Sequence, residues 1–276
     1  MKRFAFSFVF LFLIAFAYQA HAQQTQTQEQ RTTPLIQIDK KADELMHKMS
    51  DLLANAKDIS FRTKGTEEKI KSGKKVPVQV TREVVMHRPD GAWMHFTSQA
   101  SDRNRDLQMW YDGKTLTLQS DKEKVYARTK TPPTLDETYD FVGSTLNMPT
   151  PMADLLYSDS YDSFFSDDTV GGYVKLDKVE GLSCHQLAFK NRLINWRIWI
   201  AAGNEPKPCK LELTYKRDFD KPVYSITFLD WNFAAKIADG QFTHEPPAGY
   251  QKIKIIGREP LPPGAPALPR TQTQEH

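Results

Sequence analysis

Residues 107–120 read LQMWYDGKTLTLQS, and this stretch decides the fold. Apolar and polar side chains alternate on both sides of an Asp-Gly pair at 112–113, which is the period of a half-buried strand. Asp-Gly between two alternating runs is a strong signal for a hairpin. A two-residue loop would pair Met109 with Leu116, so the sequence predicts an antiparallel hairpin whose apolar face holds Leu107, Met109, Leu116 and Leu118.

The same alternation recurs on both sides of this hairpin. Between 76 and 86 the apolar residues fall on one parity: Val76, Val78, Val80, Val84 and Met86. Further strands are predicted at 92–98, 173–179, 183–190, 196–201, 209–215 and 223–231. Short turns join neighbouring strands, whereas a parallel pair needs a long crossover. The sequence therefore predicts a large antiparallel sheet.

Two regions have the apolar spacing or capping residues of helices. Residues 39–56 carry an apolar stripe at helical spacing, with Asp39 at the N-cap position. Thr134 and Glu137 form a capping box that predicts a helix from about 135 to 146, and Pro151 starts a shorter one at 152–157. A helix, five or six strands, a helical insert and about five more strands indicate an α+β fold.

The N-terminus has the pattern of a secretory signal peptide. Lys2 and Arg3 precede an apolar run at 4–17, which is shorter than the roughly 20 residues that a membrane span needs. The small-x-small pattern at 20–22 predicts cleavage after Ala22. We expect a periplasmic or secreted protein without a transmembrane span in its mature chain.

Composition then divides the chain into four parts: a signal peptide at 1–22, a disordered Gln/Thr-rich segment at 23–35, one domain at 36–257 and a Pro-rich disordered tail at 258–276. The formal net charge of +3 falls to +1 once Lys2 and Arg3 are removed with the leader. Such a balance does not favour nucleic-acid binding, which usually requires a concentrated basic surface.

An ordered series of motifs resembles one family of secreted bacterial proteins. The motifs are DGKT at 112–115, PMADLL at 151–156, CHQLAF at 184–189, NWRIWI at 195–200, WN at 231–232 and FTHEPPAG at 242–249. Together they resemble domain-of-unknown-function family 2092 over nearly all of the mature domain. The resemblance implies the architecture of the periplasmic lipoprotein carriers, a strongly curved antiparallel sheet (an open half-barrel) with helices covering its concave face. It also implies a carrier or binder of lipid.

No motif in the sequence predicts catalysis, a metal site or a cofactor. Cys184 and His185 are adjacent, so in a strand they point to opposite faces and His185 does not serve as a base for the thiol. The aspartates between 159 and 168 lack the spacing of a calcium-binding loop and indicate a solvated acidic loop. We therefore expect a protein that is not an enzyme.

Cys184 and Cys209 are the two cysteines of the chain, and an oxidising compartment permits a disulfide between them. Hairpin counting, however, places Cys184 on the face of Ile198 and Cys209 on the opposite face beside Trp199, with one strand between them. A bulge near 203–208 would correct both problems. A disulfide is the preferred interpretation, and two free thiols are the alternative.

Apolar stripes on the first helix, the strands and the helical insert are candidates for lining a ligand cavity. These candidate residues are Met46, Met49, Leu53, Val84, Met94, Phe96, Met109, Leu116, Leu118, Tyr139, Phe141 and Val142. An ordinary packed core is the alternative, because periodicity does not separate a filled interior from a cavity.

Two functions remain open. In the first, a monomer binds an apolar ligand, a lipid or the acyl chain of a lipoprotein, between sheet and helices. In the second, the protein is an envelope scaffold or sensor module with a solid core that binds a protein partner. An exposed aromatic patch around Trp110 or Trp199 would favour the second function.

Overall fold

The computed structural model describes residues 37–100, 104–146, 148, 150–216 and 221–255, which belong to one compact unit. The predicted signal peptide, its cleavage site after Ala22, the Gln/Thr-rich segment and the Pro-rich tail lie outside the described residues. The domain limits therefore stay a prediction.

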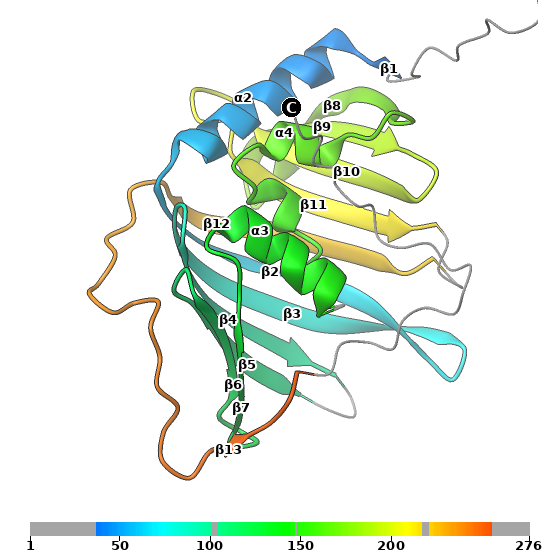
Figure 1. The fold of residues 1–276 in the computed structure, drawn as a ribbon. Coiled ribbons are helices and arrows are strands. Elements are labelled where there is room, and N and C mark those ends of the chain that lie inside the picture. Colours follow the sequence, from blue (N-terminus) through cyan, green and yellow to red (C-terminus); the bar gives the residue numbers. More distant parts are fainter. Residues whose placement is uncertain (1–36, 101–103, 147, 149, 217–220, 256–276) are drawn as a thin grey trace, which may run out of the picture. The chain divides into compact units, whose positions relative to one another are not determined.

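The described strands form one sheet that curves strongly around the helices (Figure 1). Its strands are β1 (Gln37–Ile38), β2 (Asp58–Lys71), β3 (Lys74–His87), β4 (Gly91–Gln99), β5 (Arg105–Tyr111), β6 (Thr115–Ser120), β7 (Val125–Lys130), β8 (Val170–Val179), β9 (Leu182–Lys190), β10 (Ile194–Ala201), β11 (Pro208–Tyr215), β12 (Val223–Asn232) and β13 (Gln251–Lys252). The spatial order is β1-β8-β9-β10-β11-β12-β2-β3-β4-β5-β6-β7-β13. The long strands pair antiparallel, as predicted, and the two-residue strands β1 and β13 add parallel pairs with β8 and β7.

The β5–β6 hairpin keeps the predicted faces but not the predicted register. Met109 pairs with Leu118, and Tyr111 pairs with Leu116. The loop is longer than two residues because the Asp112 carboxylate accepts hydrogen bonds from the backbone N–H of Lys114 (3.0 Å) and Thr115 (2.8 Å). Since the register differs by two residues, every side chain stays on its predicted face.

Strands β2 and β7 are absent from the sequence prediction. The outer half of β2 reads GTEEKIK, in which charged residues conceal the alternation, and β7 is only six residues long. Both strands are placed by their partners, since β2 pairs with β3 along its whole length and β7 pairs with β6. Tertiary pairing here outweighs weak local preference.

The helices are α2 (Lys40–Asn55), α3 (Leu135–Asp140), the π-helical turn η1 (Phe141–Thr145), the 3-10 turn η2 (Ala153–Leu155) and α4 (Ser160–Phe164). Asp39 caps α2 as predicted by accepting from Ala42 N at 3.0 Å. The helix predicted at 135–146 becomes π-helical after Asp140, and the one predicted at 152–157 is reduced to η2. The predicted acidic loop contains α4, whose N-cap is Asp159.

The strand order explains why helices cover one face of the sheet. β7 and β8 lie near opposite edges, so the insert that connects them has to cross the sheet. It begins beside the β3–β4 turn, where Leu135 N donates to Pro89 O at 2.7 Å. It ends against α2 and β10, where the Ser50 and Ser160 hydroxyls are 2.8 Å apart. We call the covered, concave face the inner face and the opposite one the outer face (Figure 1).

Candidate functional site

Five of the twelve predicted lining residues belong to the solid core. Met46, Met49 and Leu53 on α2 are fully buried, and Val84 and Leu116 on the inner face are buried with them in one hydrophobic cluster. At these positions the structure supports the packed-core alternative, because the side chains contact one another.

The other seven predicted residues are half-buried: Met94, Phe96, Met109, Leu118, Tyr139, Phe141 and Val142. Strand pairing sets Met94 opposite Met109, and Met109 opposite Leu118, so they form a row across β4, β5 and β6. With Phe96, which follows Met94 on the same face, we call these residues the apolar strip. Their partial exposure distinguishes this part of the inner face from the closed core under α2.

The helical insert borders the apolar strip. Tyr139 and Val142 pack against the core cluster, as do Met94, Phe96 and Met109. The Tyr139 hydroxyl lies 3.7 Å from the Met86 sulfur, and burial raises the pKa of that phenol. Tyr139 and Val142 therefore pack against the same cluster as Met94, Phe96 and Met109, and Phe141, the third predicted residue of the insert, is half-buried.

A polar cluster that the sequence analysis missed lies next to the strip. Arg82 on β3 points to the inner face and is only 8% exposed, and its Nη1 has no hydrogen-bond partner in the part of the chain that the structure describes. The hydroxyls of Thr63, Ser98 and Tyr224 are also buried, and they too have no hydrogen-bond partner within the described ranges. Arg82 interrupts the apolar parity of Val78, Val80, Val84 and Met86, and that interruption was the available signal.

The Arg82 guanidinium is held between two aromatic rings. Its Cζ lies 4.9 Å from the centre of the Phe96 ring and 5.6 Å from that of Tyr224. Burial raises the pKa of Tyr224 to about 12, and the positive charge of Arg82 opposes that rise. Tyr224 is therefore a neutral hydroxyl at physiological pH and is able to donate a hydrogen bond.

The two cysteines form a disulfide on the outer face, with Cα atoms 6.7 Å apart. Cys184 pairs with Ala201, so it shares the face of Trp199, and its predicted placement with Ile198 is wrong. Trp199 lies opposite Lys210 while Ile200 lies opposite Pro208, which leaves Cys209 as the extra residue of a bulge. A bulge thus brings the two cysteines together, but it lies within the β10–β11 pair at Cys209 and not in the loop at 203–208.

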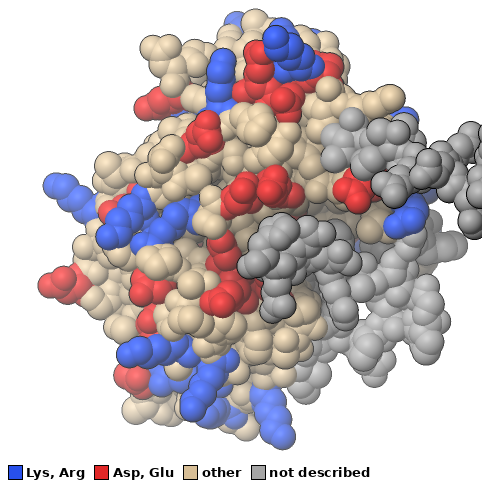
Figure 2. Space-filling view, turned by 45° about the horizontal axis from the view of Figure 1, so that its top comes forward, with Lys and Arg blue, Asp and Glu red and all other residues tan. Residues whose placement is uncertain are grey.

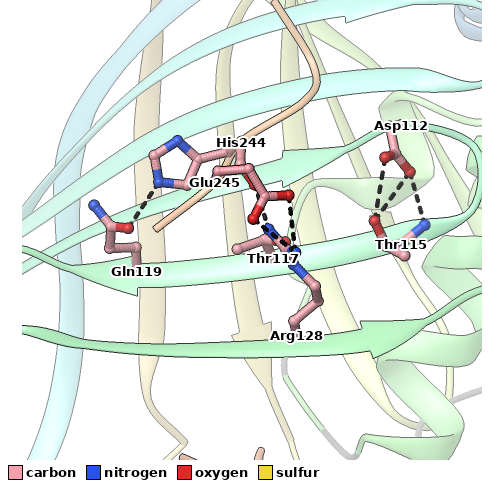
Figure 3. Close-up of polar contacts among 7 residues, drawn as sticks. All are labelled: Asp112, Thr115, Thr117, Gln119, Arg128, His244 and Glu245. Atoms are coloured by element: carbon pink, nitrogen blue, oxygen red, sulfur yellow. Dashed lines mark hydrogen bonds and ion pairs between the residues drawn. The ribbon is translucent and has the colours of Figure 1, made fainter. Parts of the chain in front are cut away.

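The segment between β12 and β13 is attached to the outer face of β5–β7 (Figure 3). The His244 ring stacks on Trp110 with centres 3.7 Å apart, and its Nε2 lies 2.7 Å from Gln119 Oε1. Arg128 forms an ion pair with Glu245 at 3.1 Å and donates to the His244 carbonyl oxygen. Burial and the charge of Arg128 lower the pKa of His244, which is therefore neutral at pH 7 and donates from Nε2.

Both tryptophans proposed for an exposed aromatic patch are buried. Trp110 is covered by His244, and Trp199 packs against the disulfide. Lys/Arg and Asp/Glu side chains are interspersed on the face shown in Figure 2, without a continuous basic area.

Two grooves lie away from the predicted lining residues. One, of about 550 Å³, is bordered by Asp58, His87, Asp112 and Phe242. In it His87 Nδ1 lies 2.6 Å from the Asp58 carboxylate. The other, of about 260 Å³, lies beside Cys209. Within the described ranges, no cluster of three or more His, Cys, Asp or Glu side chains is arranged to hold a metal ion.

The family model described as "Predicted periplasmic protein (DUF2092)" matches residues 42–256. The chain belongs to this family. The match spans β2 to β13, the helical insert and the segment that carries His244, and it confirms the family named from the motif series. A search of curated protein sequences finds no match to this DUF2092 chain.

Several solved structures resemble the DUF2092 chain at low sequence identity. MucB shares 11% identity at a TM-score of 0.40, over 75% of this chain and 64% of that one. LprF from Mycobacterium bovis shares 10% at 0.44, over 72% and 97%. A LolA superfamily protein from Nitrosomonas europaea shares 10% at 0.36, over 74% and 97%. In the part of the chain that the structure describes, none of the helices is long and apolar enough to cross a membrane.

Proposed function

We propose that this protein is a periplasmic, non-enzymatic binding protein for a lipid or for the acyl chain of a lipoprotein. The observation that carries the proposal is the half-buried apolar strip of Met94, Phe96, Met109 and Leu118 beside the helical insert. A solid core would have covered these side chains, whereas a ligand site needs them partly open. In this proposal the ligand lies on the strip and the core under α2 stays closed.

The size of the ligand follows from the free energy that its burial supplies. Each methylene that leaves water contributes about 0.8 kcal/mol, so the roughly 14 methylenes of a palmitoyl chain supply about 11 kcal/mol before costs. Association costs at least about 4 kcal/mol, and micromolar affinity requires about 8 kcal/mol in net terms. Full burial of the palmitoyl chain leaves about 7 kcal/mol, just short of that figure, so the proposal requires a long acyl chain that is buried along its whole length.

Methionine suits such a site. Its unbranched, polarisable side chain adapts to ligands of irregular shape, and two of the four strip residues are methionines. Cys184, which lies beside His185 in the sequence, is bonded to Cys209 and is not a free thiol. The proposed role is therefore binding, with a signal peptide cleaved after Ala22, a mature monomer and an acylated protein or lipid as its partner.

The scaffold alternative loses the feature that would have supported it, because Trp110 and Trp199 are both buried. It remains the competing explanation that the experiment has to exclude. In that case the apolar strip would contact a protein partner in place of an acyl chain.

Native mass spectrometry of the protein secreted through its own leader, followed by lipid extraction, tests the proposal. The expected result is a stoichiometric lipid that co-purifies with the protein and is displaced by added palmitate. An unliganded mass, together with a melting temperature that does not respond to added palmitate, would contradict the binding of acyl chains. The same mass reports whether the chain begins at Gln23.

A further inference from the structure

We propose that Arg82, with the hydroxyls of Thr63, Ser98 and Tyr224, binds the anionic head group of the ligand, a carboxylate or a phosphate. This inference rests on the proposed function and specifies its ligand as an acidic amphiphile. The acyl chain would lie on the apolar strip. The head group would lie beside the strip, on the inner face of β12, β2, β3 and β4.

The four polar side chains are neighbours on the inner face. Thr63 pairs directly with Arg82, and Arg82 pairs with Phe96. Ser98 follows two residues after Phe96 and so points to the same face as its diagonal neighbour Arg82. Tyr224 comes from β12, and its ring lies 5.6 Å from the guanidinium.

All four groups are buried without the partners that buried polar groups normally have. Arg82, Thr63, Ser98 and Tyr224 are 8%, 2%, 1% and 3% exposed. Among the described residues, Arg82 Nη1, Thr63 Oγ1, Ser98 Oγ and the Tyr224 hydroxyl oxygen have no hydrogen-bond partner. Native proteins satisfy most buried polar atoms, so four unsatisfied ones on neighbouring strands call for a missing partner.

The chemistry of the four groups selects that partner. A guanidinium has donors but no acceptor, and each of the three hydroxyls is able to donate. The complementary group is rich in acceptors and carries negative charge, which describes a carboxylate or a phosphate. No acidic side chain of the described residues forms an ion pair with Arg82; Glu67, on the same face, lies opposite Tyr224 and Val78.

The apolar strip leads to this cluster. Phe96 belongs to the strip and also covers the guanidinium, with its ring centre 4.9 Å from Arg82 Cζ. Because Phe96 is half-buried, rotation of its ring would expose the guanidinium beside Met94. An amphiphile then places its charged end at Arg82 and its chain across Met94, Met109 and Leu118.

A structural role is the competing explanation for Arg82. In that case the guanidinium only joins the rings of Phe96 and Tyr224 through cation–π contacts, and its charge has no effect on ligand choice. The two explanations differ in whether the protein distinguishes an acid from its uncharged ester. That difference is measurable on the wild-type protein.

The test measures the affinity of the full secreted chain for palmitate, palmitoyl lysophosphatidate, methyl palmitate and inorganic phosphate by calorimetry. We expect palmitate and lysophosphatidate to bind at least tenfold more tightly than methyl palmitate, and tenfold corresponds to about 1.4 kcal/mol. Inorganic phosphate alone should bind far more weakly than lysophosphatidate, because it lacks the acyl chain.

Variants then assign that preference to the cluster. Arg82→Gln should bind the ester with wild-type affinity and lose the preference for the acids, and Tyr224→Phe, which keeps the ring, should reduce it. Arg62→Gln is the matched control, because Arg62 lies next to Thr63 on β2, is 57% exposed and pairs with Asp230. It should behave as wild type.

Each outcome supports or overturns the inference. Equal wild-type affinity for palmitate and methyl palmitate would overturn it and leave the proposed function intact. Binding of none of the three lipids would overturn both. If inorganic phosphate bound as tightly as lysophosphatidate, the acyl chain would contribute nothing to affinity. That result would overturn the inference that the ligand is an acidic amphiphile. The wild-type comparison decides the question even if Arg82→Gln fails to fold.

Discussion

Removal of the disulfide tests how the outer face is stabilised. Cys184 and Cys209 are separated by 25 residues and join β9 to β11 across the end of β10. Closing a loop of this length lowers the entropy of the unfolded chain by an amount that stabilises the fold by about 3.5 kcal/mol. The double variant Cys184→Ala, Cys209→Ala should lose about that free energy of unfolding, since alanine adds no polar group to a buried site.

Urea denaturation of the oxidised wild type and the double variant measures the difference directly. For a domain of this size, each kcal/mol corresponds to about 2–4 °C, so the melting temperature should fall by about 7–14 °C. Wild type reduced with dithiothreitol is the matched control and should resemble the variant. Palmitate affinity should not change, because the apolar strip lies on β4–β6 and the bond lies on β9 and β11. A loss below 1 kcal/mol, or a loss of affinity in a folded variant, would refute the reasoning.

Three further predictions follow from burial and charge. Met49→Ala, in the closed core, should lower the free energy of unfolding by about 2–5 kcal/mol. Met109→Ala, on the half-buried strip, should lower it by less than about 1.5 kcal/mol and should weaken palmitate binding. Equal losses of stability for the two variants in urea denaturation would contradict this division. Asp39→Ala should cost about 1–2 kcal/mol in the same assay, because it removes the cap of α2 and the acceptor for Tyr173 N. Because the pKa of His244 is lowered in the folded protein, the unfolded chain binds a proton at this residue at a higher pH than the folded one does. The free energy of unfolding of wild type should therefore fall as the pH drops from 7 through about 6.5 and below, and that of His244→Gln should fall less. His185, whose pKa burial also lowers, remains in both proteins and cancels in that comparison, and identical slopes would contradict the assignment to His244.

The sequence predicted those parts of the fold that depend on one-dimensional periodicity. The two faces of the β5–β6 hairpin and the cap of α2 at Asp39 followed from alternation and from helical spacing. The hairpin register did not follow, because the Asp112 side chain accepts backbone hydrogen bonds that lengthen the loop. Strand β2 did not follow either, because its order comes from pairing with β3 and β12.

The candidate site was only half visible in the sequence. Apolar spacing grouped Met94 and Met109 on the strands with Met49 on α2, but Met49 is fully buried and the two strand methionines are half-buried. This difference depends on which elements pack against each side chain, and one-dimensional periodicity does not contain that information. Arginine is usually exposed, so a single Arg82 within an apolar series does not by itself predict a buried side chain. Its burial depends on Phe96 and Tyr224, which come from two other strands.

Photo-crosslinking with palmitate that carries a diazirine near its chain end tests the central claim most directly. The account predicts labels, located by tandem mass spectrometry, on Met94, Met109, Leu118 or the facing residues Tyr139 and Val142, and their loss when unlabelled palmitate competes. Labels on the outer face, at Trp110 or Thr117, or labels that competition leaves unchanged, would contradict an acyl-chain site on the inner face.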